Sequence, residues 1–277
     1  MTKTPVRIIA HRGMGQRFVV PSAPPENTLP AFKAGWETGA IGCELDVHAT
    51  FDGQAIVIHD ATTDRTTNAN WIVAAHTAEE LQALDAGRWK NLRWAGTRLP
   101  LLSEVLAILP DRKQLFIELK DGPQVVPGTV DAIRASGKGA AQVVLMSFDI
   151  DTIGAMKFAL PDYTCLLIVV FEADYATGRW NVLYDEGPGF RTVTTAYDPK
   201  TLLQLLRRYR LDGIDSSFTM PGSLPSTLAD AGLQLVTWTV DDPLVALDLV
   251  NAGVTTITTD RPKEMRDALV RAGVRVA

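Results

Sequence analysis

Residues 6–13 read VRIIAHRG, a short apolar run that passes directly into a polar turn. An apolar run of this length predicts a buried strand, and the end of such a strand is where α/β enzymes place their chemistry. His11 can exchange a proton near neutral pH, Arg12 offers a planar fork of donors that suits phosphate oxygens, and Gly13 permits a turn that a side chain would obstruct. The stretch therefore predicts the first strand of an α/β fold with functional groups at its end.

A second predicted strand, Ile41–Val47, contains two acids, Glu44 and Asp46, and is followed by His48. Side chains alternate between the two faces of a strand, so these three side chains share one face. Two ionised acids on one buried face repel each other, and one of them is held protonated unless a cation lies between them. A hard divalent ion such as Mg²⁺ or Ca²⁺ satisfies both acids. The alternative is an exposed strand end at which both acids are solvated.

A third apolar run, Ala55–Ile58, follows the turn signal Asp52-Gly53 and ends at His59-Asp60, so a second histidine lies at a strand end. From residue 61 to residue 100 the periodicity breaks into polar and tryptophan-containing pieces, with one short helix expected over residues 78–84. We interpret residues 61–100 as an insertion subdomain within a single barrel domain that spans residues 1–277.

Strands and helices alternate regularly through most of the remaining chain. Strands are expected at residues 114–119, 143–146, 165–170, 213–216, 233–240 and 255–259, and helices at 102–109, 130–134, 151–159, 201–210, 223–231, 244–252 and 262–272. A further helix that ends at Gly39 is expected after Asn27 or Thr28, either of which can cap it. Residues 172–199 are predicted to be irregular.

The principal strands, counted from residue 6, number eight and alternate with helices, which predicts a (β/α)₈ TIM barrel in the α/β class, with the insertion after the second strand. A doubly wound open sheet is the alternative. No glycine-rich dinucleotide fingerprint or phosphate-binding loop follows a strand in this sequence, so that alternative lacks its usual chemistry.

The composition is that of a soluble globular protein, with 46% hydrophobic and 21% charged residues. The formal net charge of −5 argues against a nucleic-acid partner and against an anionic membrane surface. Cys43 and Cys165 both lie in apolar runs, which predicts reduced, buried thiols. The sequence opens without a signal-type segment and its apolar runs are too short to span a bilayer, so we expect a cytoplasmic protein without stable membrane insertion.

In a barrel, the C-terminal ends of the strands meet at one rim, so side chains that are distant in sequence come together there. The expected set is His11, Arg12, Glu44, Asp46, His59, Glu118, Lys120 and Trp238. The three carboxylates form part of an oxygen cage for a divalent ion, and the two basic side chains add positive charge for a phosphate group. The two imidazoles can act as acid and base on opposite sides of phosphorus.

Six short motifs occur in order along the chain: His11-Arg12-Gly13, Pro25-Glu26-Asn27-Thr28, Glu44-x-Asp46, His59-Asp60, Glu118-x-Lys120 and Thr259-Asp260-x-Pro262. Together they resemble the glycerophosphodiester phosphodiesterase family, over almost the whole chain. The resemblance implies a metal-dependent barrel enzyme that hydrolyses glycerophosphodiesters, such as glycerophosphocholine or glycerophosphoethanolamine, to sn-glycerol 3-phosphate and an alcohol.

The resemblance also implies roles for individual residues. It makes His11 and His59 the acid/base pair, Glu44, Asp46 and Glu118 the metal ligands, and Arg12 and Lys120 the phosphate contacts, to which we add Trp238 as a substrate contact. Glu26 is expected to orient Arg12 or to lie near the metal, and His48 to support the site from beside Asp46. Asp60 and Asp260 are interpreted as structural residues that orient other side chains or cap helices.

One departure from the family is the segment of residues 14–24, which is longer than usual and predicts a flap that affects which alcohol group is preferred. Two other functions remain open: a phospholipase D-like enzyme that acts on lysophospholipid or sphingolipid through the same site, and a barrel that binds phosphodiesters without catalysis. The pair of imidazoles argues against the binder. The lack of an evident amphipathic or basic docking stretch argues against the lipid enzyme. The sequence does not distinguish a monomer from a homodimer.

Overall fold

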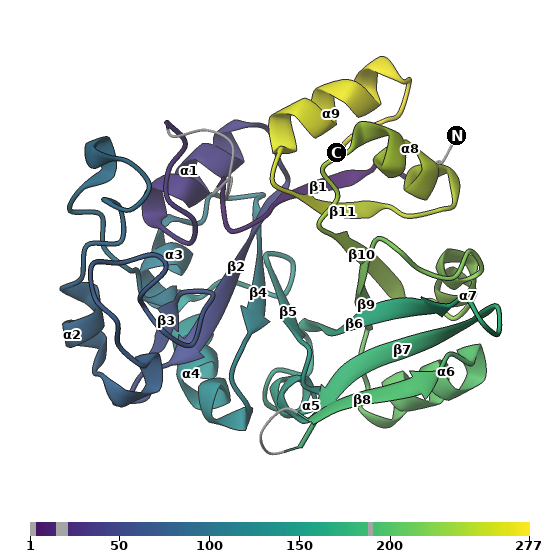
Figure 1. Ribbon diagram of the computed structural model, residues 1–277, viewed down its shortest axis with the longest axis horizontal. Coiled ribbons are helices and arrows are strands. Elements are labelled where there is room, and N and C mark those ends of the chain that lie inside the picture. The colour runs from purple at the N-terminus through teal and green to yellow at the C-terminus, as the bar shows by residue number, and fades with distance from the viewer. Residues whose placement is uncertain (1–3, 15–21, 188–190) are drawn as a thin grey trace.

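A computed structural model describes residues 4–14, 22–187 and 191–277 of the chain. Within the predicted flap of residues 14–24, residues 15–21 lie outside these ranges. Within them, eight parallel strands form a barrel that can be followed in Figure 1. These strands are β1 (Arg7–Ala10), β2 (Gly42–Ala49), β4 (Gln114–Leu119), β5 (Val143–Ser147), β6 (Thr164–Asp174), β9 (Gly213–Ser217), β10 (Gln234–Trp238) and β11 (Thr256–Thr259).

Parallel pairings of β1 with both its neighbours and of β5 with β6 close the barrel. Strand β1 pairs in parallel with β2 on one side and with β11 on the other, and β5 pairs in parallel with β6. The order around the barrel is β1-β2-β4-β5-β6-β9-β10-β11. This closure confirms the predicted TIM barrel and excludes the doubly wound open sheet.

Helices cover the outside of the barrel between successive strands (Figure 1). They are α1 (Leu29–Glu37), α3 (Leu102–Ile108), α4 (Val126–Ser136), α5 (Ile150–Ala159), α6 (Pro199–Arg208), α7 (Leu224–Asp230), α8 (Pro243–Asn251) and α9 (Pro262–Arg271). Their apolar faces pack on the outward-facing strand residues, as Phe32 of α1 packs in one core cluster with Leu45 and Val47 of β2. Both cysteines, Cys43 and Cys165, are buried free thiols, as predicted.

Helix α4 begins at Val126, ahead of the predicted residue 130. The sequence there reads Val-Pro-Gly, and proline and glycine ordinarily indicate the end of a regular element. Proline is tolerated in the first turn of a helix, however, because the N–H that it lacks would have no partner there. The helix therefore extends through a stretch that the sequence predicts as a loop.

The chain leaves the barrel after β2. Strand β3 (Ala55–Val57) pairs antiparallel with β2, and residues 61–100 follow it. This segment contains α2 (Ala78–Gln82) and 3₁₀ turns at Val73–Ala75 and Leu92–Trp94, and another such turn, Pro123–Val125, precedes α4. The segment of residues 61–100 packs with β3 in a small apolar cluster of its own that includes Ile58, Leu81 and Leu99. The chain returns to the barrel at α3.

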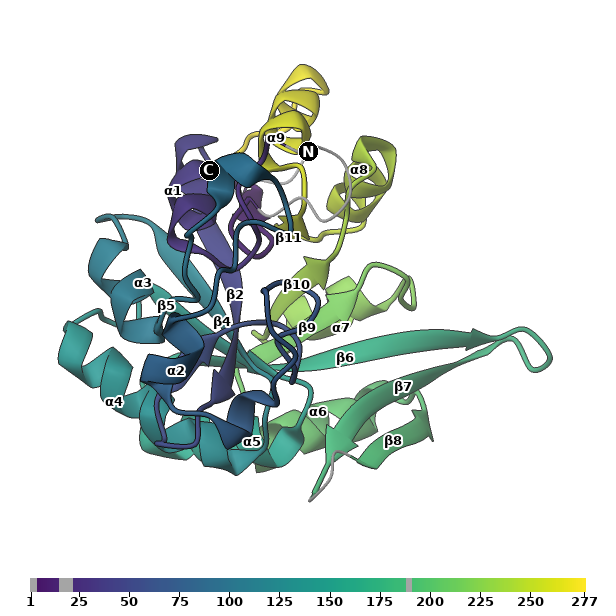
Figure 2. The same ribbon diagram turned by 60° about the vertical axis from the view of Figure 1, so that its left-hand side comes forward.

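The sequence predicts residues 172–199 to be irregular, but the described residues 172–187 and 191–196 form most of an antiparallel arm. Strand β6 continues to Asp174 and pairs with β7 (Arg179–Glu186), which pairs in turn with β8 (Arg191–Ala196). The ribbon of β6 and β7 projects away from the barrel (Figure 2). In the part of the arm that extends beyond the barrel, few side chains are buried, with Phe171 and Val182 among them. This segment therefore lacks the apolar pattern from which strands are predicted.

The interior of the barrel is apolar in its lower layers and polar at the rim. The apolar cluster inside the strands includes Ile9, Phe116, Val144, Leu166 and Val236. Above it, the C-terminal ends of the strands carry the charged residues that the sequence places there. In the described residues, no helix combines the length and the apolar character that a membrane span requires.

Candidate active site

The turn after β1 places His11 and Arg12 at the mouth of the barrel. Arg12 has a left-handed backbone with a φ of 49°, and Gly13 follows with a φ of 78°. A Cβ on Gly13 would lie 2.6 Å from the carbonyl carbon of Ala31, so only glycine fits against α1. The Arg12 N–H also donates to Glu44 at 2.9 Å. The predicted turn is therefore fixed by both neighbouring elements.

Glu44, Asp46 and Glu118 converge as the period of two along the strands predicts. One carboxylate oxygen from each lies within 4.8 Å of the other two. Burial and the charge of Asp46 raise the pKa of Glu44 to about 8, and burial also raises the pKa of Glu118. Burial opposes ionisation of Asp46 as well, but Lys120 and Arg12 outweigh it and lower the pKa of Asp46. Without a cation the cluster therefore retains protons at neutral pH, as expected for converging acids.

This acidic cluster fits a hard divalent cation. It consists of carboxylates alone, and oxygen donors of this kind suit Mg²⁺ and Ca²⁺. The raised pKa of Glu44 is the signature of a carboxylate group that lacks a compensating positive charge. A bound cation would supply that charge and favour the ionised form of the group.

Two basic side chains border the acidic cluster. The Nζ of Lys120 lies 2.7 Å from Oε1 of Glu118 and 3.4 Å from Oδ1 of Asp46. The Nε of Arg12 lies 3.4 Å from Oδ2 of Asp46, and its Nη1 donates to Oε1 of Glu26 at 2.9 Å. Glu26 thus bonds to Arg12, and it does not belong to the group of three converging acids. The side chains of Arg12 and Lys120 both lie where they can contact the oxygens of a phosphate group.

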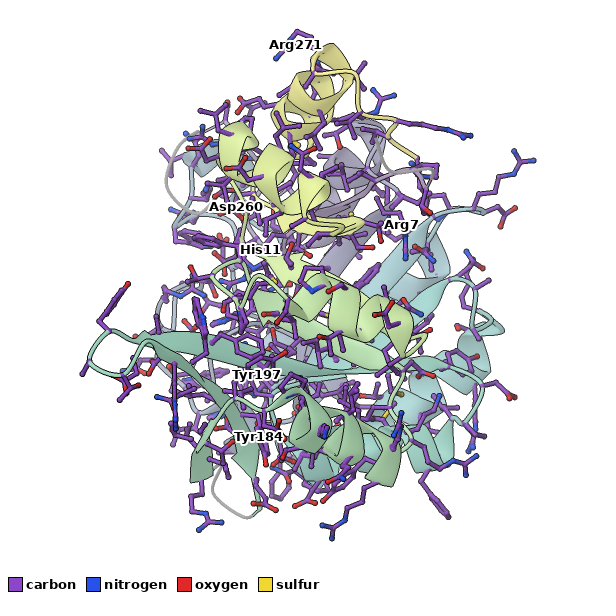
Figure 3. The ribbon with its side chains drawn as sticks, turned by 90° about the vertical axis from the view of Figure 1, so that its right-hand side faces the viewer. Arg7, His11, Tyr184, Tyr197, Asp260 and Arg271 are labelled. Carbon is purple, nitrogen blue, oxygen red and sulfur yellow. The ribbon has the colours of Figure 1, made fainter. Side chains whose placement is uncertain are left out.

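His11 is oriented by Asp260, which follows β11. The Nδ1 of His11 lies 2.8 Å from Oδ1 of Asp260, and Figure 3 shows the two residues side by side. Burial disfavours the charged imidazole, but the hydrogen bond to Asp260 and the charge of Glu44 outweigh it and raise the pKa of His11. Asp260 is itself fixed, because its backbone N–H donates to Asp241 at 2.8 Å.

His59 has an equivalent partner in Asp60, whose Oδ1 lies 2.6 Å from Nδ1 of the ring. Burial lowers the pKa of His59, and the positive charges of Lys120 and Arg12 add to this effect and outweigh the opposing charge of Asp46. Asp60 and Asp260 therefore orient the two histidines, and neither caps a helix. Orienting another side chain is one of the two structural roles expected for these aspartates.

Arg65 connects the two halves of the charged site. It pairs with Asp60, and its Nη1 and Nη2 donate to the two oxygens of Glu26 at 3.0 and 2.8 Å. Because Glu26 also holds Arg12, one chain of ion pairs joins the segment that carries His59 to the turn after β1. Such a chain restricts how these side chains can move relative to each other.

His48 holds the segment that carries His59. Its Nδ1 lies 2.8 Å from Oδ1 of Asp121, and its Nε2 lies 3.0 Å from the carbonyl oxygen of His59. Both partners are acceptors, so the ring donates from both nitrogens. Burial opposes the charged ring, but Asp121 outweighs it and raises the pKa of His48. His48 does not line the cavity and supports His59 from behind.

Asn27 and Thr28 do not cap α1, which corrects the prediction. Thr28 occupies the position before the helix, but its hydroxyl donates to the carbonyl oxygen of Pro25 at 2.6 Å. Asn27 has a φ of 57° and donates its side-chain amide to Oδ2 of Asp46 at 2.8 Å. A residue type typical of helix caps therefore orients an acid of the site instead.

These charged groups form one wall of a cavity of about 470 Å³ at the mouth of the barrel. Strands on the far side of the barrel supply a largely apolar wall, which contains Met146, Phe148, Ile168 and Trp238. The rings of Phe148 and Trp238 meet edge to face, with centroids 5.8 Å apart. The indole Nε1 of Trp238 is enclosed and has no hydrogen-bond partner in the described part of the chain, so it offers a donor to a ligand.

The structure adds site residues that the sequence reasoning did not single out: Arg65, Asp121, Asp215 and Asp241. Asp121 and Asp241 lie just after β4 and β10, so the strand-end rule could have found them. Arg65 lies in the non-periodic insertion, and Asp215 lies inside β9, where no local signal distinguishes either residue. Among the described residues that line the cavity, Asp215 is the one acid within a strand of the apolar side, whereas Asp241 lies in the loop after β10.

The comparisons with known proteins agree with this geometry. The sequence profile of the Glycerophosphoryl diester phosphodiesterase family matches residues 11–264. The chain is 32% identical over 270 residues to a glycerophosphodiester phosphodiesterase of Caldanaerobacter subterraneus, a match that covers 96% of this chain and 98% of the relative. The chain belongs to this family. The family membership predicted from the motifs is confirmed, and with it the enzyme class, a phosphoric diester hydrolase.

Solved structures show the same barrel in other members of the family. The Agrobacterium tumefaciens glycerophosphodiester phosphodiesterase is 26% identical, with a TM-score of 0.71 over 95% of this chain and 99% of that chain. A phosphodiesterase of Oleispira antarctica, solved in complex with its product sn-glycerol-3-phosphate, has a TM-score of 0.79 at 21% identity and covers 95% of this chain and 96% of that chain. At this identity the second likeness concerns the fold.

Proposed function

We propose that this phosphodiesterase hydrolyses glycerophosphodiesters, such as glycerophosphocholine or glycerophosphoethanolamine, to sn-glycerol 3-phosphate and an alcohol. The observation that carries the proposal is a single cavity that combines an acidic cluster, two basic side chains and two histidines, each oriented by an aspartate. The family and its named members narrow the substrate from phosphodiesters in general to glycerophosphodiesters.

Glu44, Asp46 and Glu118 hold a divalent cation, Mg²⁺ or Ca²⁺, in this proposal. When bound, such a cation polarises phosphoryl oxygens and stabilises the charge that develops on them. Arg12 and Lys120 contact the same phosphate group from beside the acids, and the free indole N–H of Trp238 donates to the substrate from the other wall. Positive charge on one side and a shaped apolar surface on the other orient the diester.

His59 and His11 serve as base and acid. Burial, the leading cause of the lowered pKa of His59, leaves this ring neutral near pH 7 and able to accept a proton. The leading contribution that raises the pKa of His11 is its hydrogen bond to Asp260, which lies outside the acidic cluster. The raised pKa favours the protonated form of His11, which can give a proton to the departing alcohol. A pair whose pKa values are pushed apart is typical of acid–base catalysis.

The nucleophile in this scheme is the 2-hydroxyl of the glycerol. Its oxygen attacks phosphorus while His59 takes its proton; the bond from phosphorus to the alcohol oxygen breaks, and His11 protonates that oxygen. Water then opens the cyclic glycerol phosphate: His11 takes a proton from water and His59 returns one to the 2-oxygen. Intramolecular attack is favoured because a well-oriented neighbouring group gains an effective molarity on the order of 10⁵ M or more.

A substrate analogue tests the nucleophile. A glycerophosphodiester that lacks only the 2-hydroxyl should bind with similar affinity but react far more slowly than the natural diester, and the natural diester should yield a cyclic species that can be trapped. An analogue that reacts as fast as the natural diester, with no cyclic species, requires attack by water instead.

Product identification tests the proposed function as a whole. The protein is incubated with glycerophosphocholine or with lysophosphatidylcholine, and the release of sn-glycerol 3-phosphate and of choline is measured for each, with Mg²⁺ or Ca²⁺ and with a chelator. We expect release of sn-glycerol 3-phosphate from glycerophosphocholine, dependent on the cation. Choline release from lysophosphatidylcholine alone would favour the phospholipase D-like alternative, and binding without turnover of either substrate would favour a non-catalytic barrel.

A further inference from the structure

Asp215 is a buried acid within the apolar wall of the cavity. It lies in β9, in register with Ile168 on β6 and with Val236 on β10. Both of these partners belong to the apolar cluster inside the barrel, and side chains in register on paired strands share a face. Asp215 therefore points inward, where it lines the cavity with only 3% of its surface exposed.

The carboxyl group of Asp215 lacks the partners that every neighbouring acid has. Among the described acids that line the cavity, Asp260 bonds to His11, Asp241 accepts from the hydroxyl of Thr259, Glu118 pairs with Lys120, and Glu44 accepts from the Arg12 N–H. The Oδ1 atom of Asp215 is enclosed and has no hydrogen-bond partner in the ranges that the structure describes. Buried polar groups are almost always paired, so this exception indicates a group that a ligand completes.

The surroundings of Asp215 indicate the chemistry of that ligand. Burial raises the pKa of this carboxyl group well above its ordinary value, and the charges of Glu118 and Glu44 add to the effect. A carboxyl oxygen accepts a hydrogen bond whether or not the group is ionised, which matches the donor of a hydroxyl group. The anionic phosphate oxygens have no proton to donate to such an acceptor, and the opposite wall provides Arg12 and Lys120 for them.

The depth of Asp215 distinguishes the two ends of the diester. Asp215 lies two residues before the end of β9 at Ser217, whereas Trp238 ends β10 and is in register with Ser217. The acid therefore lies below the rim and the indole lies at it. In the proposed scheme the alcohol leaves while the cyclic glycerol phosphate stays bound, so the alcohol lies toward the mouth and the glycerol reaches the depth of Asp215.

We propose that Asp215 is a positioning residue that pairs with a hydroxyl group of the substrate's glycerol, and so selects diesters that carry glycerol over diesters that do not. This inference rests on the proposed function. In this proposal the apolar wall recognises the glycerol and the charged wall binds the phosphate group.

Ligand binding by two variants tests this role without relying on turnover. Calorimetry in the presence of Mg²⁺ measures the affinity of the wild type, D215L and D215N for sn-glycerol 3-phosphate and for inorganic phosphate. We expect D215L to weaken binding of sn-glycerol 3-phosphate about tenfold or more, as for one lost hydrogen bond to a buried group, and to leave phosphate binding unchanged. D215N should keep most of the affinity, because its amide also donates and accepts.

The choice of ligand and the controls keep the result specific. Because sn-glycerol 3-phosphate has no head group, a loss cannot come from contacts to the alcohol. I168L changes the apolar neighbour of Asp215 on β6 and should affect both ligands equally. D215L should unfold at the same or a higher temperature than the wild type, since it replaces an unpaired buried carboxyl group with an apolar side chain.

Two outcomes overturn the proposal: D215L weakens both ligands in parallel, or it leaves the affinity for sn-glycerol 3-phosphate unchanged. The kcat/KM for glycerophosphocholine should fall in D215L by the same factor as the affinity or more, and an unchanged value would also count against Asp215. A wild type that binds sn-glycerol 3-phosphate but hydrolyses no glycerophosphodiester would contradict the proposed function instead, and this result is distinguishable from the other two.

Discussion

The two walls of the cavity differ in how completely their polar groups are paired. On the charged wall, Glu26 bonds to both Arg12 and Arg65, and each histidine bonds to an aspartate. On the apolar wall, Asp215 and the indole of Trp238 have polar atoms without partners in the described part of the chain. The Nε of Arg12 on the charged wall also lacks a hydrogen-bond partner there, but it lies 3.4 Å from Oδ2 of Asp46. Ion pairs thus hold the charged wall in fixed positions, as catalysis requires, whereas the unpaired groups of the apolar wall remain available to a ligand. The difference supports the proposed division, in which one wall performs the chemistry and the other recognises the substrate.

The largest expected effect comes from the acids of the charged wall. Substitution of Glu44, Asp46 or Glu118 by Ala should abolish activity, because the cation loses a ligand. Stability without the cation should stay the same or rise for Glu44 and Glu118, whose raised pKa values reflect repulsion among the acids. It should fall for Asp46, because Lys120 and Arg12 lose the buried carboxylate with which they pair. Thermal unfolding and activity, measured on the same samples, check both expectations. Activity lost only because the variants are unfolded would contradict the assignment of these acids.

The pH dependence of stability sharpens this prediction. The pKa of Glu44 is raised from 4.5 to about 8, so between these values the folded chain binds more protons than the unfolded chain and its stability falls as the pH rises. E44Q cannot ionise, so in chelator at pH 9 it should unfold at a higher temperature than the wild type, with a smaller difference at pH 5. E79Q makes the same change at an exposed position and should behave as the wild type. Equal curves for E44Q and the wild type would contradict the argument.

The histidines come next in magnitude. H11A and H59A should each lower kcat by roughly 10²–10⁴, the usual contribution of a positioned acid or base, and leave cation binding largely intact. H76A is the matched control, because His76 stacks on Trp71 outside the cavity and should not affect kcat. An unchanged kcat in either active-site variant, or loss of cation binding in both, would contradict the two-histidine assignment.

The pH–rate profile separates the two histidines. The kcat/KM should be bell-shaped, with an acid limb below pH 6.5 from His59, whose pKa is lowered, and an alkaline limb above pH 6.5 from His11, whose pKa is raised. D260N removes the negative charge of Asp260 and so weakens the hydrogen bond that raises the pKa of His11. Its alkaline limb should therefore move to lower pH while the acid limb stays in place. If D260N instead moves only the acid limb, then His11 is the base and His59 is the acid.

The apolar wall should give the smallest effect. W238F keeps an aromatic ring against Phe148 but removes the Nε1 donor. We expect KM to rise roughly 2–10-fold, in line with one lost hydrogen bond, with little change in kcat. Steady-state kinetics with glycerophosphocholine check this. A fall in kcat as large as that of the histidine variants would contradict the division between the two walls.

The sequence predicts the barrel and the charged wall for the same reason, namely that both follow from local periodicity. Alternating apolar runs define the strands, and the period of two places Glu44 beside Asp46 and Glu118 beside Lys120. The rim then follows from topology, because parallel strands in a barrel end on one side. Positions fixed by these rules need no knowledge of tertiary contacts.

The remaining features depend on contacts that no local pattern encodes. The arm of β6, β7 and β8 is held by cross-strand pairing with few buried residues, so its sequence has no apolar rhythm. Arg65 bonds to Glu26, which lies 39 positions earlier in the chain. Asn27 bonds to Asp46, although asparagine is a residue type that favours helix caps. Asp215 is recognisable only once its strand neighbours are known to face inward.

The central claim, that the charged wall acts through a cation held by its three acids, is tested most directly by removing and restoring that cation. The release of sn-glycerol 3-phosphate from glycerophosphocholine is measured after exhaustive chelation and then during titration with Mg²⁺ or Ca²⁺, for the wild type and for E44Q. We predict no turnover after chelation, saturable recovery in the wild type and no recovery in E44Q. Undiminished turnover of the chelated wild type would contradict the claim.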